Sequence, residues 1–206
     1  MRYFFVFLFF IISTISFAQD NNTKEVLKAN YASVIMYHRF GDSRYPSTNI
    51  KKEQFLEHIT ELLKPKYNLI NIEKALNAIN NTSLVKDRSV VITIDDAYSS
   101  VFNYAWPIFK KHNIPFTLFV STDVIDNNTP GYMSWEQIRI LRDNGVTIGS
   151  QTKSHPHMFR LDKQNIINEL SISNERFVDE IGSKPRIFAY PYGEYNLEVL
   201  EQVKLH

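Results

Sequence analysis

The chain has 206 residues, of which 44% are hydrophobic and 22% charged, a composition that suits one globular domain. Basic and acidic residues nearly balance at a formal net charge of +1, so no basic excess favours nucleic-acid binding. Cysteine is absent, which excludes a disulfide framework, a thiol nucleophile and a thiolate metal ligand.

The first residues have the pattern of an export signal. A basic residue precedes the apolar run 3–12, and the small residues Ser16 and Ala18 stand where a signal peptidase reads the chain. This run is about half of the roughly 20 residues that a membrane-spanning helix needs, which favours a cleaved signal over an uncleaved anchor. We therefore predict a signal peptide over 1–18 and a polar leader over 19–30. The protein would be exported to the periplasm, cell envelope or exterior, without stable membrane insertion after cleavage.

From residue 31 onward, short apolar stretches alternate with longer amphipathic ones. Apolar, β-branched and aromatic runs predict strands, whereas helical spacing with capping residues predicts helices. The expected strands are Ser33–Phe40, Ser89–Asp96, Pro115–Thr122, Gly145–Thr152 and Arg186–Gly193. The expected helices cover 51–63, 71–79, 101–112, 134–145 and 162–181. Because strands and helices alternate and the strands are apolar throughout, we predict one α/β domain with a parallel sheet over 31–206.

Polar or aromatic clusters fall at the C-terminal ends of four predicted strands. In parallel α/β folds the working groups lie at those ends and in the loops that follow. The clusters are Tyr37-His38-Arg39, Asp95-Asp96, Gln151 with His155 and His157, and Tyr190-Pro191-Tyr192-Gly193. We therefore expect them to converge on one rim of the domain.

The acidic pair Asp95-Asp96 ends an apolar strand that has no structural need of charge. Adjacent strand residues point to opposite faces, so one carboxylate can bind a cation while the other takes a proton. A helix cap or a solvated turn accounts for such a pair equally well when it is taken alone.

Two histidines lie two residues apart, and Gln151 lies four residues before His155. Imidazole with carboxylate is a common ligand set for zinc or a similar divalent metal. Such a metal would lower the pKa of bound water to about 7 and polarise an acyl oxygen, with a nearby aspartate as base. Histidines near loops are also often simple surface residues, so both interpretations stay open for His155 and His157.

Three segments together resemble the first three motifs of the polysaccharide deacetylase family, which is carbohydrate esterase family 4 with its NodB-homology domain. They are Thr93–Ala97 (TIDDA), Ser150–Pro156 (SQTKSHP) and Phe188–Gly193 (FAYPYG), and their order, spacing and strand context agree. The resemblance covers about residues 33–200. It implies a deformed (β/α) barrel and metal-dependent hydrolysis of N-acetyl groups on amino sugars.

The resemblance also implies roles for single residues. Asp95 matches the catalytic base, Asp96 and His155 match metal ligands, and Pro191–Gly193 matches the loop that shapes the substrate groove. In that loop the backbone N–H of Tyr192 would stabilise the oxyanion. The implied cofactor is a divalent metal, zinc first with nickel or cobalt as alternatives. The implied partner is an N-acetylated polysaccharide or oligosaccharide. His38 stands on the same rim as a groove residue without a fixed role.

The chain departs from the family pattern at three places. Gln151 replaces a metal-binding histidine, and its amide oxygen is a weaker ligand, so His157 is the substitute to consider. Ala189 replaces an arginine that would orient the catalytic aspartate. The chain also stops at His206, before the family's last two motifs, so we expect a domain that is incomplete at its C-terminus. Two alternatives therefore stay open: an impaired glycan-binding or regulatory relic, and an amidase acting on a smaller substrate.

Overall fold

The computed structural model describes residues 28–80 and 83–206, so the predicted signal peptide and most of the polar leader lie outside the described residues. Lys28–Ala29 form β1, which pairs antiparallel with β6 (Val85–Lys86). Strand pairing therefore starts before the domain boundary that the sequence predicts at residue 31. No helix among the described residues has the length and apolarity needed to cross a membrane.

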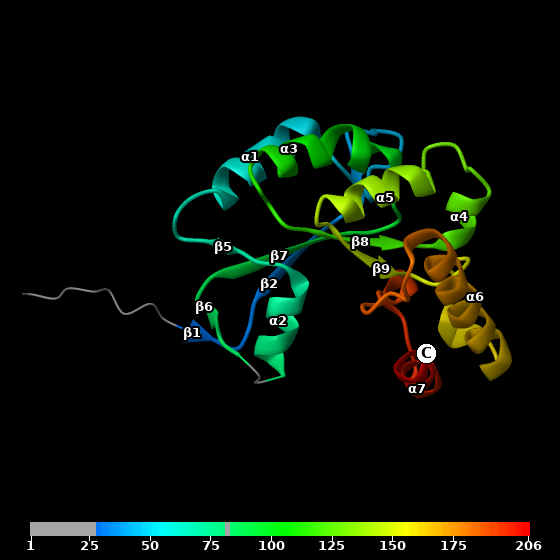
Figure 1. Ribbon diagram of the computed structural model, residues 1–206. Coiled ribbons are helices and arrows are strands. Elements are labelled where there is room, and N and C mark those ends of the chain that lie inside the picture. The colour runs from blue at the N-terminus through cyan, green and yellow to red at the C-terminus, as the bar shows by residue number, and fades with distance from the viewer. Residues whose placement is uncertain (1–27, 81–82) are drawn as a thin grey trace, which may run out of the picture.

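A parallel sheet forms the centre of the domain (Figure 1). β2 (Ser33–Tyr37) pairs along one edge of β7 (Ser89–Ile94). The other edge of β7 pairs first with β5 (Asn68–Leu69) and then with β8 (Thr117–Val120), and β8 pairs with β9 (Thr147–Ser150). The predicted α/β fold with a parallel sheet is confirmed. Within the described residues no pairing joins β9 back to β2, so the sheet is open there rather than a closed barrel.

Helices cover the sheet on both sides (Figure 1). One face carries α1 (Lys52–Leu62), α3 (Trp106–Lys111) and α5 (Trp135–Asp143), and α2 (Ile72–Ile79) lies on the opposite side. Beyond β9 lie α6 (Lys163–Ile181) and α7 (Leu197–Leu205), with α6 packed against α4 (Thr122–Asp126) and α5. The smaller elements are β3 (Arg39–Phe40), β4 (Asn49–Ile50), α4 and two single 3-10 turns, Met158–Arg160 and Pro191–Gly193.

Two separate hydrophobic clusters hold these layers together. The larger one lies between the sheet and α1, α3, α5 and α6, and in it the fully buried rings of Phe55 and Phe109 meet edge to face at 5.4 Å. Burying such a side chain contributes roughly 1.5–3 kcal/mol. The smaller cluster joins α6 and α7 to the turn at Met158 and is formed by Met158, Ile166, Leu170 and Val199. We call these the main core and the second core.

The helix ends follow the predicted capping signals. The Asn71 side chain accepts a hydrogen bond from the Lys74 N–H at the start of α2. Ser134 and Gln137 form the predicted capping box of α5. Gly182 ends α6 with φ 83°, a left-handed conformation that glycine adopts without a steric cost.

Three predicted elements differ from the structure. The strand expected over 33–40 splits into β2 and β3, because the chain leaves β7 at His38 to pair with β4. The helix expected over 101–112 begins with a wider π turn, which places Pro107 in the first turn of α3, where its missing N–H costs nothing. The strand expected over 186–193 is wrong: only a single bridge forms, from Phe188 to Ser150. Pro191 then cannot donate to a ladder, and the chain turns.

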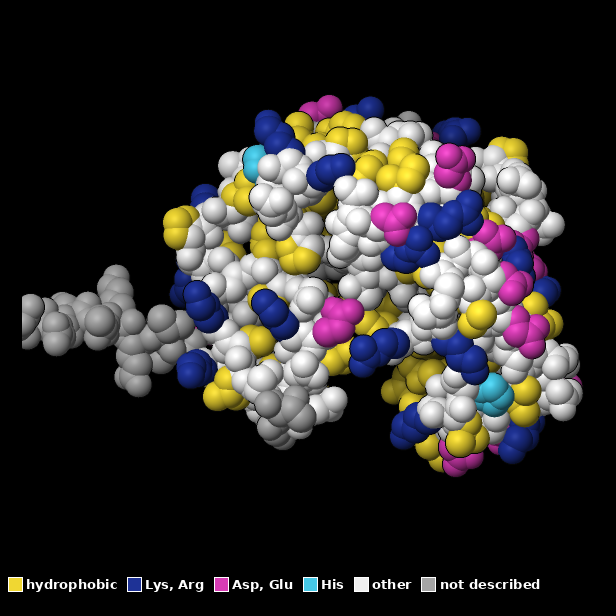
Figure 2. All heavy atoms as spheres, in the orientation of Figure 1, with side chains coloured by type: hydrophobic (Ala, Val, Ile, Leu, Met, Phe, Trp, Pro, Cys, Tyr) yellow, Lys and Arg dark blue, Asp and Glu magenta, His cyan; other side chains and the backbone are white. Residues whose placement is uncertain are grey.

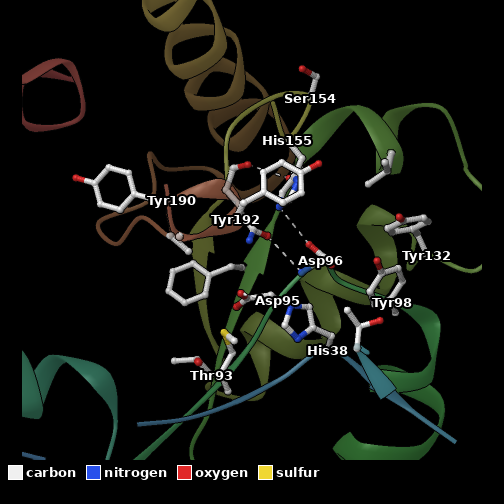
Figure 3. Close-up of a pocket in the computed structure, with 18 residues that line it drawn as sticks. His38, Thr93, Asp95, Asp96, Tyr98, Tyr132, Ser154, His155, Tyr190 and Tyr192 are labelled. Carbon is white, nitrogen blue, oxygen red and sulfur yellow. Dashed lines mark hydrogen bonds and ion pairs between the residues drawn. The ribbon is translucent and has the colours of Figure 1, made fainter. Parts of the chain in front are cut away.

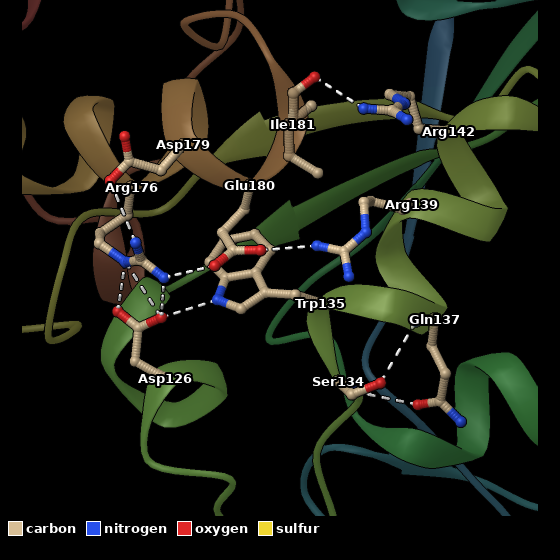
Figure 4. A network of polar contacts seen from close by, with 10 residues as sticks. All are labelled: Asp126, Ser134, Trp135, Gln137, Arg139, Arg142, Arg176, Asp179, Glu180 and Ile181. Atoms are coloured by element: carbon tan, nitrogen blue, oxygen red, sulfur yellow. Dashed lines mark hydrogen bonds and ion pairs between the residues drawn. The ribbon is translucent and has the colours of Figure 1, made fainter.

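A polar network joins α4, α5 and α6 (Figure 4). Asp126 accepts hydrogen bonds from Trp135 Nε1 at 2.7 Å and from Arg176 Nη2 at 2.8 Å. Arg176 also binds Glu180, which in turn binds Arg139 at 2.6 Å. These bonds connect three helices, and basic and acidic side chains are interspersed on the surface over α5 and α6 (Figure 2).

We predict that Arg176→Met lowers the free energy of unfolding by about 1–3 kcal/mol, because it leaves the partly buried Asp126 and Glu180 without their shared cation. Urea denaturation measures the change. The matched control is Arg44→Met, since the Arg44 side chain is 78% exposed in its pair with Asp42 and should contribute within about 0.5 kcal/mol. Equal changes in both variants would contradict a stabilising role for the network.

Candidate functional site

A cavity of about 790 Å³ opens at the C-terminal ends of β2, β7, β8 and β9 (Figure 3). Its lining includes predicted site residues from all four clusters of the sequence: His38, Asp95, Asp96, Gln151, His155, Tyr192 and Gly193. The first five residues lie at the ends of these strands or in the loops that follow them, and the turn at 191–193 forms one side of the cavity. The convergence expected at one rim is therefore present in the structure.

Asp95 lies past the end of β7, although its N–H still donates to Tyr37 O at 2.9 Å. The residue is 9% exposed. Burial raises the pKa of its carboxyl to about 7, the negative charge of Asp96 adds to this, and a hydrogen bond from Gln151 opposes it. A buried carboxyl of this kind exchanges protons near neutral pH, as a general base requires.

Asp96 does not point to the opposite face of the sheet, as strand alternation would have placed it. β7 ends at Ile94, and the chain then turns through left-handed conformations at Asp96 (φ 71°) and Ala97 (φ 52°). Both carboxylates therefore line the same cavity. The expectation that the pleat separates the two carboxylates is wrong, because this turn sets where each of them lies.

His38 faces the acidic pair from the end of β2 (Figure 3). Its Nε2 lies 3.9 Å from Asp95 Oδ2, and the ring is largely shielded from solvent. Burial lowers the pKa of His38, and the positive charge of Arg39 lowers it further against the opposing effect of Asp96. A half-buried imidazole beside a carboxylate is placed to carry a proton into or out of the cavity.

His155 approaches Asp96 from the loop after β9. Its Nε2 lies 3.6 Å from Asp96 Oδ1, and this nitrogen is buried without a hydrogen-bond partner among the described residues. The residue has φ 58°, and its N–H donates to Thr152 Oγ1 at 3.0 Å, which holds the loop in that conformation. Burial lowers the pKa of His155, so the ring is neutral at pH 7, the form that binds metals.

Gln151 is almost fully buried, and its side chain bonds to the Asp95 carboxyl and to the Asp96 backbone. Its Oε1 accepts the Asp96 N–H at 3.3 Å, and its carbonyl oxygen accepts Ser121 Oγ at 2.9 Å. The amide oxygen that would replace a histidine ligand is thus already engaged with the backbone of Asp96.

His157 is turned away from Asp96. Its Nδ1 lies 2.6 Å from Glu194 Oε2, and its ring stacks on Tyr192 at 4.1 Å with an angle of 15°. Within the described part of the chain, no group of three or more His, Cys, Asp or Glu side chains is arranged to hold a metal ion. An orphaned His155 Nε2 beside a carboxylate fits two ligands of a divalent cation, whereas Gln151 and His157 do not supply a third in this arrangement.

The turn Pro191–Gly193 lines one side of the cavity through Tyr192 and Gly193. Tyr192 and Gly193 have φ 60° and 69°, and the Gly193 and Glu194 N–H groups bond back to Tyr190 and Pro191. The N–H of Tyr192 has no such backbone acceptor among the described residues. The Tyr192 ring lies edge to face against His155 at 4.6 Å.

Sequence reasoning missed two tyrosines of the cavity wall, Tyr98 and Tyr132, whose rings lie 4.8 Å apart (Figure 3). Burial raises the pKa of Tyr98, and hydrogen bonds involving Tyr132 and Asp96 raise it further. Tyr98 follows the acidic pair by two residues, which could have pointed to it. Tyr132 lies in a loop distant in sequence, and an isolated β-bridge holds it beside Tyr98. No local sequence pattern indicates that contact.

Comparisons with known proteins agree with this geometry. The family model described as polysaccharide deacetylase matches residues 83–206. The chain is 26% identical over 168 residues to a putative polysaccharide deacetylase, YxkH, of Bacillus subtilis, an alignment that covers 82% of this chain and 59% of that protein. It is 25% identical to a poly-beta-1,6-N-acetyl-D-glucosamine N-deacetylase of Staphylococcus aureus, over 89% of this chain and 67% of the relative.

A peptidoglycan-N-acetylglucosamine deacetylase, PgdA, of Listeria monocytogenes is 28% identical over 69% of this chain and only 31% of its own length. Among solved structures, IcaB from Ammonifex degensii superposes with a TM-score of 0.77 at 25% identity, covering 85% of this chain and 80% of that one. Streptococcus pyogenes deacetylase PplD, in complex with acetate, gives a TM-score of 0.77 at 20% identity, covering 87% and 80%, a likeness of fold.

Proposed function

The chain belongs to the polysaccharide deacetylase family, and from its site we propose that it hydrolyses N-acetyl groups from amino sugars of a cell-wall or extracellular polysaccharide. One observation carries the proposal. A buried carboxyl with a pKa of about 7 shares a cavity with the Asp96–His155 pair and a free backbone donor at Tyr192. The activities named for the relatives from Staphylococcus and Listeria support this substrate class.

Asp95 acts as the general base. The pKa of its carboxyl is about 7, so at neutral pH a useful fraction of molecules has the carboxylate ionised and ready to accept a proton from the attacking water. The Gln151 side chain holds this carboxylate through a hydrogen bond and the Asp96 backbone through another. The base is therefore fixed before substrate arrives.

The Tyr192 N–H stabilises the oxygen that becomes negative when water attacks the acetyl carbon. A preorganised backbone donor of this kind typically contributes about 2.7–4 kcal/mol to the transition state. The left-handed turn leaves this donor without a backbone acceptor, which supports the assignment.

His38 gives the proton that the leaving sugar amine needs. It lines the same cavity and lies 3.9 Å from Asp95, so it can act on the amine from the β2 side of the carboxylate. A neutral imidazole would first take up a proton, and Asp95 is within reach after it has received one from water.

Asp96 and His155 would hold the divalent metal of this family, zinc first and nickel or cobalt as alternatives. When bound, such an ion polarises the acetyl oxygen and makes water a stronger nucleophile. Because the protein would supply only two ligands, water and substrate would have to complete the coordination, and we therefore expect the metal to bind weakly. Neither Gln151 nor His157 is assigned as a ligand.

A glycan-binding relic is the second candidate. The observation that favours it is the engagement of Gln151 Oε1 by the Asp96 N–H, which leaves a site without three strong ligands. Such a protein would keep the groove for an N-acetylated polysaccharide and lose turnover. In either case we propose an exported protein, because the predicted signal peptide over 1–18 would direct it to the envelope where such glycans occur.

We predict that Asp95→Asn lowers acetate release from N-acetylated chitooligosaccharides at least 100-fold in the presence of zinc, nickel or cobalt, because the amide cannot accept the proton. Acetate is measured enzymatically, and peptidoglycan serves as the second substrate. Asp179→Asn is the matched control, since its side chain is 64% exposed on α6. Equal release by the parent chain and Asp95→Asn would sink the assignment. Glycan binding without any release would favour the relic.

We predict that His38→Gln lowers kcat for N-acetyl sugars about 100-fold but has little effect on hydrolysis of 4-nitrophenyl acetate. The nitrophenolate leaves without protonation, so the ester does not need an acid, whereas the sugar amine does. Both rates are measured on the same preparation. An equal loss on the ester and the amide would show that His38 does not donate the proton.

We predict that Gln151→His raises the affinity for zinc at least about tenfold, because imidazole replaces an engaged amide oxygen as a third ligand. Isothermal titration calorimetry measures the affinity without reference to activity. His155→Ala should lower it in the same assay, and His112→Ala, an exposed histidine at the end of α3, should leave it unchanged. Identical titration of the Gln151→His and parent proteins would contradict this account of Gln151.

A further inference from the structure

The segment around Tyr192 is held in place in part by His157 and Glu194, which have no role in the proposed reaction. The Tyr192 ring contacts two histidines, edge to face with His155 and flat on His157. Its backbone has φ 60°, a left-handed conformation that is costly for a non-glycine residue. Gly193 follows with φ 69°, so two consecutive residues are left-handed. Two backbone hydrogen bonds close the turn, from the Gly193 N–H to Tyr190 O and from the Glu194 N–H to Pro191 O, and contacts of the Tyr192 ring add to them.

The ring of His157 packs on the ring of Tyr192 and so helps to fix the conformation of the turn. The two rings stack at 4.1 Å and 15°, close to parallel. Contacts between aromatic rings of this kind stabilise a structure beyond the area that they bury, so this contact offsets part of the cost of the left-handed backbone. Glu194 Oε2, 2.6 Å from His157 Nδ1, sets the rotation of the imidazole and lies two residues after Tyr192.

His157 is itself fixed by the second core. Its neighbour Met158 is fully buried in that cluster, and the His157 carbonyl accepts the Arg160 N–H at 2.9 Å. Asn196 Nδ2 makes a further bond to Phe159 O at 3.4 Å, which joins the two loops again. The imidazole is therefore part of a rigid support, and the Tyr192 turn rests on it.

We propose that His157 is a positioning residue, which with Glu194 holds the Tyr192 turn so that its backbone N–H faces the cavity. This inference rests on the proposed deacetylation for its kinetic consequence, although the support of the turn does not depend on it. It assigns to His157 a role other than the metal ligation that its spacing from His155 suggests. A change at His157 acts on the transition state through Tyr192, and it leaves the Asp96–His155 pair in place.

The kinetic test compares His157→Ala, His157→Phe and Glu194→Gln in the full chain with N-acetylated chitooligosaccharides. We expect His157→Ala to lower kcat about tenfold with KM changed less than twofold, because the donor acts in the transition state. His157→Phe keeps a flat ring, and Glu194→Gln keeps an oxygen that accepts from Nδ1, so both should retain at least half of kcat. His112→Ala controls for loss of a histidine elsewhere. Equal kcat for the Ala and Phe variants, or a loss confined to KM, would overturn the proposal.

A second measurement does not require activity. Amide hydrogen exchange of the 188–196 segment should speed up at least tenfold in His157→Ala and remain near the parent rate in His157→Phe, with the melting temperature unchanged. Zinc titration should give the same affinity for His157→Ala and the parent. Unchanged exchange in His157→Ala, or a loss of zinc affinity as large as that of His155→Ala, would overturn the proposal. If the parent chain releases no acetate, deacetylation fails as its function, and the exchange result alone decides the role of His157.

Discussion

The site depends on keeping two adjacent carboxylates, Asp95 and Asp96, in one cavity. Neighbouring negative charges repel each other, and the burial of Asp95 reduces the screening that water would provide. Three features reduce this repulsion. The pKa of Asp95 is raised, and Gln151 forms hydrogen bonds with both residues. The imidazoles of His38 and His155 lie 3.9 Å from the Asp95 carboxylate and 3.6 Å from the Asp96 carboxylate, respectively. The surrounding groups therefore stabilise the two carboxylates even when no substrate is bound.

The same constraint explains the backbone around the cavity. Asp96, Ala97, Thr152, His155 and Tyr192 all have positive φ, although none is glycine. Each such residue costs on the order of 1–3 kcal/mol unless its surroundings fix it. The Asp96 N–H bonds to Gln151 and the His155 N–H bonds to Thr152, so the side chains of the site also hold its loops. Shape and charge in this cavity are therefore set by the same few contacts.

The sequence predicts the repetitive part of this molecule well and the turns poorly. The strands at Ser89–Ile94 and Thr117–Val120 and the caps at Asn71 and Ser134 follow local patterns that tertiary contacts do not override. The clustering of His38, Asp95 and His155 on one rim follows from the parallel order of the strands. The turn after Ile94, the direction of His157 and the arrival of Tyr132 depend on contacts between distant segments. Nothing within a short window of sequence specifies those contacts.

The two hydrophobic clusters support different parts of the cavity, and α6 contributes to both of them, with Phe177 in the main core and Ile166 and Leu170 in the second core. Asp95, Asp96 and His38 follow strands of the main core, whereas His157 and the Tyr192 turn rest on the second core. Separate clusters can open with different free energies, because cooperative units in one domain need not unfold together. A ligand that touches both sides would stabilise each of them by mass action and would link their unfolding. Bound substrate would then couple the unfolding of the two clusters more tightly than α6, which contributes residues to both, does alone.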